Sequence, residues 1–155
     1  MAGYREIGMI TGLSQQYTVL GEAYLNAGQV DQARHTLAEI LAQVDANGEH
    51  NSTAEIHRLL GEVALAEGRS CDCVERIAQE AAETEAERQF CQAIAISQAQ
   101  SARSWELRAT MSLARLWRRQ GRIGTARAAL SEVYGWFTEG HDTRDLQDAA
   151  ALLDE

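Results

Sequence analysis

The sequence contains no lysine and no proline, and it contains only three cysteines. All 14 basic residues are therefore arginine, which excludes chemistry that depends on lysine, such as a Walker phosphate loop or a Schiff base. The absence of proline suits a mostly helical chain, because proline breaks the interior of a helix. An odd number of cysteines does not form a disulfide framework.

Long apolar runs are also lacking. No stretch approaches the roughly 18 apolar residues of a membrane span, and the first residues, MAGYREIGMITGLSQQ, show no signal-peptide pattern. Acidic residues outnumber basic ones by 23 to 14, and the net charge of −9 argues against general binding to nucleic acids or anionic membranes. We therefore expect a cytoplasmic protein that binds neither nucleic acid nor membrane.

Three segments of the chain repeat one pattern. The interval from Gly28 to Gly68 equals that from Gly21 to Gly61, whereas the interval from Gly68 to Gly121 is longer. The second unit therefore carries an insertion near 69–84. The segments read VLGEAYLNAGQVDQARHTLAEI from Val19, LLGEVALAEG from Leu59 and SLARLWRRQGRIGTARAALSEV from Ser112.

Each repeat predicts a hairpin of two helices. Apolar residues recur at helical spacing, and a glycine follows where the first helix of each unit should stop, because glycine accepts the left-handed conformation of a helix end. Small residues are expected where the two helices cross, and Ser52 with Glu55 forms a capping-box pattern before the second unit. The stop glycines are Gly28, Gly68 and Gly121, and the crossing alanines are Ala33, Ala86 and Ala126.

These features resemble the tetratricopeptide repeat (TPR) over roughly residues 14–137. Each unit is longer than the usual length of about 34 residues, and the proline common at the end of a unit is absent, so extended loops are expected. The matching residues are Leu20, Gly21, Tyr24, Gly28, Ala33 and Leu37 in the first unit, Leu60, Gly61, Gly68, Ala86, Phe90 and Ala93 in the second, and Leu113, Ala114, Trp117, Gly121, Ala126 and Leu130 in the third.

The resemblance implies an all-α fold, a right-handed superhelical array of about three TPR-like helix hairpins followed by a C-terminal capping helix. We expect a single domain over 1–155, in which the fourth helix either is continuous or breaks near Thr84. The expected units are 14–51, 52–101 with the insertion near 69–84, and 102–137, with the cap over 138–155. The expected helices are 13–27, 30–46, 53–67, 72–99, 102–120, 123–136 and 143–154.

Residues 104–155 also resemble the C-terminal tail of bacterial adenylate/guanylate cyclase–ATPase signalling proteins, which ends in degenerate TPR units. The resemblance rests on the run VYGWFTEG, the DL after it and the final ALLDE; those tails often have an aromatic residue where this chain has His141. The family's enzymatic activity does not carry over, because this chain has no cyclase or ATPase segment. What the resemblance implies is a docking or sensor surface, in the tail of such a protein or in a stand-alone copy of it.

A groove along the first helices of the units is the predicted binding surface. The groove positions of the TPR family imply mixed polar side chains here, with a basic end. We expect a non-catalytic interaction or scaffold module, without a cofactor, that binds a segment of another protein or of its own upstream signalling domain. The implied groove residues are Gln15, Thr18, Glu22, Glu55, Arg58, Glu62, Arg108, Met111 and Arg115.

Several alternatives stay open. The groove could be a solvated surface without a ligand, the array could serve homo-oligomerisation, or a small-molecule sensor pocket could lie near Trp105, Trp117 and Arg108. An enzyme is not expected, because no histidine has a serine or cysteine partner at a recognised spacing. The histidines are His35, His50, His57 and His141.

Charge and cysteine are unevenly distributed. Residues 103–127 hold seven arginines and one acid, whereas 72–87 hold six acids and one arginine. Ion pairing between neighbouring helices is expected, at about 0–1 kcal/mol for each exposed pair, and an anion or phosphate site is the alternative. Cys71, Cys73 and Cys91 lack the paired spacing of a zinc site, so no metal is expected.

An aromatic cluster precedes the last predicted helix. Beyond it, apolar residues at i, i+3, i+4 and i+7 indicate a short helix with one apolar face. A stacked array needs a cover over its last hydrophobic face. We therefore predict that Tyr134, Trp136, Phe137, Leu146 and Leu153 join the third hairpin to a capping helix, with a ligand platform as the alternative.

Overall fold

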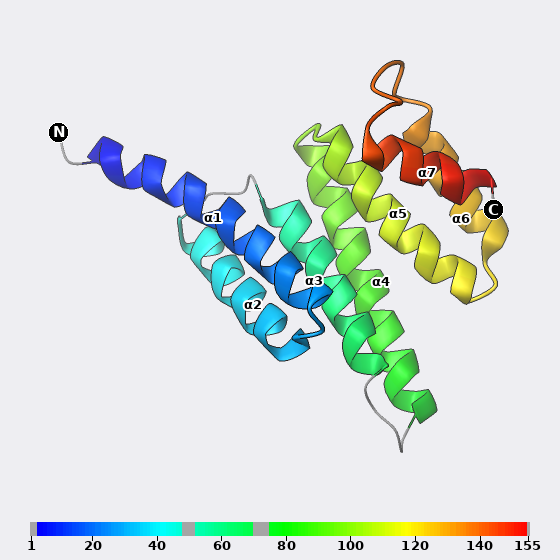
Figure 1. Cartoon of the computed structure of the whole chain (residues 1–155), viewed down its shortest axis with the longest axis horizontal. Coiled ribbons are helices and arrows are strands. Elements are labelled where there is room, and N and C mark those ends of the chain that lie inside the picture. Colours follow the sequence, from blue (N-terminus) through cyan, green and yellow to red (C-terminus); the bar gives the residue numbers. More distant parts are fainter. Residues whose placement is uncertain (1–2, 48–51, 70–74, 155) are drawn as a thin grey trace.

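The structure is a computed structural model that describes residues 3–47, 52–69 and 75–154 (Figure 1). Within these residues all regular secondary structure is helical, in seven α-helices, so the predicted all-α fold class is confirmed. The helices are α1 (Gly3–Asn26), α2 (Val30–Asn47), α3 (Thr53–Gly68), α4 (Glu75–Ala99), α5 (Arg103–Arg119), α6 (Ile123–Tyr134) and α7 (Arg144–Asp154).

Consecutive helices pack against each other along the length of the molecule. α1 packs on α2, α3 on α4, and α5 on α6, while α3 also contacts α1 and α5. α7 lies over α5 and α6, and the two ends of the chain lie at opposite extremities (Figure 1). In the described part of the chain, every close approach between helix backbones joins neighbours or next-but-one neighbours in sequence.

Glycines end two of the helices as predicted, and a third glycine has a different role. Gly28 (φ 72°) and Gly121 (φ 79°) adopt the left-handed conformation after α1 and α5. Gly68 does not, because it is the last helical residue of α3. A Cβ on Gly68 would lie 2.7 Å from the Cβ of Ala82, so glycine is needed there for the close approach of α4.

Two helix boundaries differ by two residues or more from those predicted, and one ambiguity is resolved, while the predicted start of the fourth helix at 72 lies outside the described residues. α1 begins at Gly3, well before residue 13, because three glycines and several β-branched residues weaken the helical pattern of this segment. α4 is continuous, and the Thr84 hydroxyl donates to the Glu80 carbonyl at 2.8 Å without breaking it. α6 ends at Tyr134, so Trp136 follows the helix.

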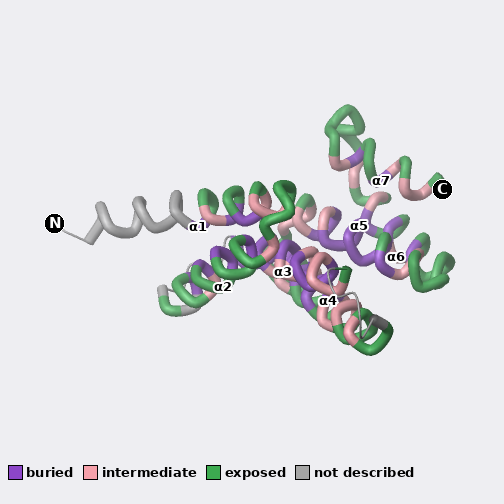
Figure 2. The backbone as a smooth tube through the Cα atoms, turned by 60° about the horizontal axis from the view of Figure 1, so that its bottom comes forward, coloured by how far each residue is buried: buried purple, intermediate pink, exposed green. Residues whose placement is uncertain are grey.

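Three clusters of buried apolar side chains hold the helices together, and the buried residues lie on the facing sides of the helices (Figure 2). Leu37 and Ile56 belong to the cluster of α2 and α3, Phe90 to that of α3, α4 and α5, and Leu130 and Leu146 to that of α5, α6 and α7. All three predicted crossing alanines are buried, namely Ala33, Ala86 and Ala126.

Two repeat glycines permit the closest helix contacts. A Cβ on Gly61 would lie 2.4 Å from the Phe90 ring, and one on Gly21 would lie 2.6 Å from Leu37. Real Cβ atoms do not approach other atoms so closely, so a larger residue at either position would force the buried Phe90 ring or the buried Leu37 side chain to shift. In the first two repeats, Gly21 and Gly61 thus lie where the two paired helices are in direct contact.

Candidate functional site

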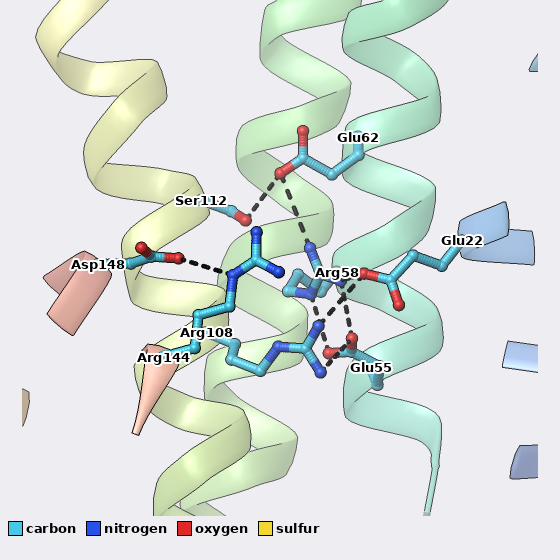
Figure 3. Close-up of polar contacts among 8 residues, drawn as sticks. All are labelled: Glu22, Glu55, Arg58, Glu62, Arg108, Ser112, Arg144 and Asp148. Carbon is cyan, nitrogen blue, oxygen red and sulfur yellow. Dashed lines mark hydrogen bonds and ion pairs between the residues drawn. The ribbon is translucent and has the colours of Figure 1, made fainter. Parts of the chain in front are cut away.

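A network of ion pairs connects α1, α3 and α5 on one side of the molecule (Figure 3). Its centre is Glu55 of α3, whose side chain is only 2% exposed. The Glu55 carboxylate accepts hydrogen bonds from Arg58 Nε at 2.9 Å and Nη2 at 2.7 Å, and Arg108 Nη1 lies 3.0 Å from it. A buried carboxylate is tolerated when it is paired, so Glu55 holds both guanidinium groups in place.

Glu22 of α1 extends this network across α3. Its Oε1 atom lies 3.4 Å from Nη2 of Arg58 and 3.3 Å from Nη2 of Arg108. Burial lowers the pKa of Arg58, but its hydrogen bond to Glu55 and the surrounding carboxylates outweigh burial and raise the pKa above its ordinary value. Arg58 therefore stays charged, and the network joins three helices through side chains.

Glu62 and two residues of α7 complete the polar surface (Figure 3). The Ser112 hydroxyl donates to Glu62 Oε1 at 2.7 Å, and Arg58 Nη1 lies 3.9 Å from the same oxygen. On α7, Arg144 Nε lies 3.8 Å from Asp148 Oδ2. The last helix thus presents charged side chains beside α5 in addition to its apolar face.

A hollow of about 480 Å³ lies beside the network. It shares Glu22 and Arg58 with a hollow of about 240 Å³, and Ser112 and Arg115 with one of about 500 Å³. We call the surface lined by these three hollows the charged groove. The first hollow is lined by Glu22, Asn26, Arg58, Arg108, Met111, Ser112, Arg115, Arg144, Asp145 and Asp148.

The structure brings most of the predicted groove residues together. Of those in the charged groove or its network, Glu55, Arg58 and Met111 are buried, so they form its floor, whereas Arg115 is exposed. Thr18 is outside it, buried with its hydroxyl donating to the Ser14 carbonyl at 2.7 Å. The residues brought together are Glu22, Glu55, Arg58, Glu62, Arg108, Met111 and Arg115, and Gln15 is exposed on α1 outside the groove lining.

Sequence reasoning missed the contribution of Ser112, Arg144 and Asp148. The sequence places the last two on the polar face of the capping helix, where they read as ordinary surface charges. How α7 is oriented on α5 depends on tertiary packing, and the helical periodicity does not encode it. Of these three residues, only Ser112 could have been predicted for the groove, because it lies one turn before Arg115 on the same helix.

The predicted cap residues separate into two groups. Leu146 is buried in the cluster of α5, α6 and α7, and Tyr134, Phe137 and Leu153 pack against that cluster. Trp136 does not join it, because α6 ends at Tyr134 and the Trp136 side chain is 61% exposed. The Arg103 guanidinium lies over the Trp136 ring, 4.1 Å from its centroid.

Arginines of residues 103–127 pair with acids of α4 and with acids of α1 and α3. Arg122 Nη1 lies 3.0 Å from Glu87 Oε1 on α4, as the charge distribution predicts, but Arg108 pairs with α1 and α3. Burial raises the pKa of Glu87, while hydrogen bonds from Trp117 and Arg122 lower it further than burial raises it, so it lies below its ordinary value. Ion pairing thus explains part of the arginine cluster.

The capping box predicted at Ser52 is wrong. Ser52 makes no side-chain capping hydrogen bond, and its hydroxyl lies 3.4 Å from that of Ser14. The Glu55 carboxylate instead binds Arg58 and Arg108. A charged partner outcompetes the backbone N–H group that a capping box would use.

The two aromatic residues named for a sensor pocket lie at different surfaces. Trp105 lies near Arg108, whose guanidinium carbon is 5.7 Å from its ring centroid. Trp117 lines a separate hollow of about 410 Å³ between α4 and α6, together with Trp136. Trp105 lines neither that hollow nor those of the charged groove, and the sensor role stays a prediction.

Neither a metal-binding cluster nor a membrane-spanning helix is found in the part of the chain that the structure describes. Within 3–47, 52–69 and 75–154, no group of three histidine, cysteine or acidic side chains could hold a metal ion. Cys91 is an exposed free thiol, and Cys71 and Cys73 lie outside the described residues. None of the described helices is long and apolar enough to cross a membrane.

Comparisons with known proteins add no family to these observations. No protein-family model matches the chain, and a search of curated proteins finds no match. The functional argument therefore rests on the charged groove itself.

Proposed function

We propose that this protein is a non-catalytic interaction module whose charged groove binds a segment of another protein. The observation that supports the proposal is the convergence of positions from separate repeats. Glu22, Arg58 and Arg108 come from three helices, and they lie on one continuous surface with the exposed Arg115 at its rim. A long polar groove suits an extended or helical segment better than it suits a small substrate.

The architecture behind this proposal is a TPR-like array of three hairpins, α1 with α2, α3 with α4, and α5 with α6. The packed pairs and the left-handed glycines support it. In such an array the first helices of the hairpins form one wall. α7 then covers the last hydrophobic face and adds charge to the end of the groove.

The resemblance of residues 104–155 to signalling-protein tails supports a role in signalling. We place the bound segment either in another protein or in a signalling or ATPase domain of the same protein. An enzymatic role has no support in the groove, since its buried carboxylate and guanidinium groups are occupied by each other.

Site-specific photo-crosslinking in the native cell tests the proposal. A photoreactive amino acid at Arg69, at the rim of the groove, should give adducts with a partner protein, whereas the same amino acid at His35, on α2, should not. The partner is then purified, and its affinity is compared for the wild type and the Arg115→Glu variant. Arg76→Glu is the matched control, because Arg76 is exposed on α4.

The expected result is a loss of affinity of about tenfold or more for Arg115→Glu, with no change for Arg76→Glu, because reversing a rim charge opposes the complementary charge of the segment. Equal affinity of all three proteins for every crosslinked partner would contradict a groove function. Thermal unfolding of the variants verifies that the fold is unchanged.

Self-association through α1 is the second candidate function. Val19 is 61% exposed and Leu20 is 42% exposed on α1, and such residues favour an apolar contact between copies. The molar mass in solution separates the two functions. A monomer at micromolar concentration would exclude self-association, and a dimer that Leu20→Ser dissociates would support it.

A further inference from the structure

The groove has a basic end, which lies between α5 and the C-terminal part of α7. This hollow of about 500 Å³ is lined by Arg115, Arg118 and Arg119 together with Ile123 and Leu152. We call it the basic hollow. Its one acid is Glu62, so arginines outnumber acids there by three to one, in a chain whose net charge is −9.

The acid of the basic hollow, Glu62, already has a hydrogen-bond partner and an ion-pair partner. Glu62 accepts a hydrogen bond from Ser112 at 2.7 Å and lies 3.9 Å from Arg58, which belongs to the network. Its charge is therefore shared with side chains outside the three arginines. The basic hollow keeps an excess of positive charge that no carboxylate of its own lining neutralises.

Two of the arginines are available for a ligand. Arg115 and Arg119 are exposed and lie one helical turn apart, and neither makes an ion pair or hydrogen bond with any residue that the structure describes. Like charges at this spacing repel each other and destabilise a helix slightly. Arg118 differs, because its Nη1 donates to the Leu152 carbonyl at 3.0 Å and so fixes the end of α7 on α5.

The basic hollow also has an apolar part. Ile123, at the start of α6, is 57% exposed beside the arginines, and Leu152 is partly buried. An exposed isoleucine next to unpaired guanidinium groups matches a ligand that carries carboxylates and an aliphatic side chain together. A long polyanion such as RNA fits less well, because the acidic remainder of the chain repels it.

We propose that the basic hollow binds an acidic segment of a partner protein, in which at least two carboxylates flank an aliphatic side chain. The carboxylates pair with Arg115 and Arg119, and the aliphatic side chain lies against Ile123 and Leu152. The inference rests on the proposed function, since it names the chemistry of the segment that the charged groove receives.

A selection from a random dodecapeptide display library against the full chain tests the inference. The selected peptides should be enriched in aspartate and glutamate next to leucine, isoleucine or valine. A synthetic fluorescent copy of the most enriched peptide is then titrated by fluorescence anisotropy. The Arg115→Gln/Arg119→Gln variant should bind it at least tenfold more weakly than the wild type.

Two control proteins make the result specific. The Arg76→Gln/Arg88→Gln variant removes two exposed arginines of α4 and should bind like the wild type. The Ile123→Ser variant should weaken binding of the selected peptide but not of a polyglutamate peptide, which has no aliphatic side chain. Circular dichroism melting verifies that each variant is folded.

The outcomes distinguish this inference from the proposed function. Selected peptides without acids, or peptides whose binding is unchanged in Arg115→Gln/Arg119→Gln but lost in Arg108→Gln, would overturn the inference and leave the groove function standing. No enriched peptide, or peptides insensitive to all groove variants, would overturn both. A single-stranded RNA that binds more tightly than the acidic peptide would also overturn the inference.

Discussion

Replacing Glu55 with glutamine is expected to destabilise the whole array. Glu55 is 2% exposed and its carboxylate contacts Arg58 and Arg108 at 2.7 to 3.0 Å. The substitution leaves Arg58 buried with only more distant carboxylates, at 3.4 Å from Glu22 and 3.9 Å from Glu62. Removing one partner of a buried pair costs about 3–5 kcal/mol.

We expect the lower end of that range, about 3 kcal/mol, because the glutamine still offers one acceptor and because Glu22 remains near Arg58. For a chain of this size, the melting temperature should then fall by about 6–12 °C. Urea and thermal unfolding followed by circular dichroism measure both quantities.

Glu85→Gln is the matched control. The Glu85 carboxylate also accepts two hydrogen bonds from one arginine, Arg88, but this pair lies at the surface. Hydrogen bonds from Arg88 and Gln89 and the nearby arginine charges lower the pKa of Glu85 to about 2 against the effect of burial, yet the side chains of Arg88 and Glu85 are 59% and 44% exposed, and the pair should contribute only about 0–1 kcal/mol. If Glu55→Gln cost no more than Glu85→Gln, the network would not stabilise the fold. Replacing Glu55 and Arg58 together with methionine should cost less than Glu55→Gln alone, because Arg108, the charge then left beside them, is 28% exposed and keeps its contact with Glu22.

Two further predictions concern packing. Gly61→Ala should lower the free energy of unfolding by about 1–3 kcal/mol, because the new Cβ would lie 2.4 Å from the Phe90 ring; Gly124→Ala, in open space on α6, should be neutral or stabilising by up to about 1 kcal/mol. Equal effects of the two substitutions in urea unfolding would contradict the close-contact argument. Deleting residues 138–155 removes α7 and exposes an apolar cluster, so the truncated protein should aggregate or melt earlier; a soluble, monomeric and equally stable product in light scattering and calorimetry would refute a capping role.

Helix positions were predictable because their signals are local. Apolar periodicity and the stop glycines lie within one or two turns of the elements that they define, so six helices were expected close to their observed ranges. The start of α1 was not, because its glycine-rich first turns have weak intrinsic helix preference and are helical in spite of it.

The groove was predictable only in part. The resemblance to the tetratricopeptide repeat implied that Glu22, Arg58 and Arg108 share one surface, and the structure brings these three residues together, while their role in binding stays a prediction. The resemblance did not reveal that these side chains would pair with each other, since pairing depends on distances between helices. The exposure of Trp136 was missed for a different reason, because α6 ends at Tyr134, two residues before the predicted end at 136.

The pair of Glu22 and Arg108 has a mechanical consequence. It joins α1 and α5, whose backbones do not approach each other within the described residues, across one face of α3. A motion that spreads α1 and α5 apart on this face must break the 3.3 Å contact between Glu22 and Arg108. The Glu22–Arg108 pair should therefore act as a tether that limits how far this face of the array can open.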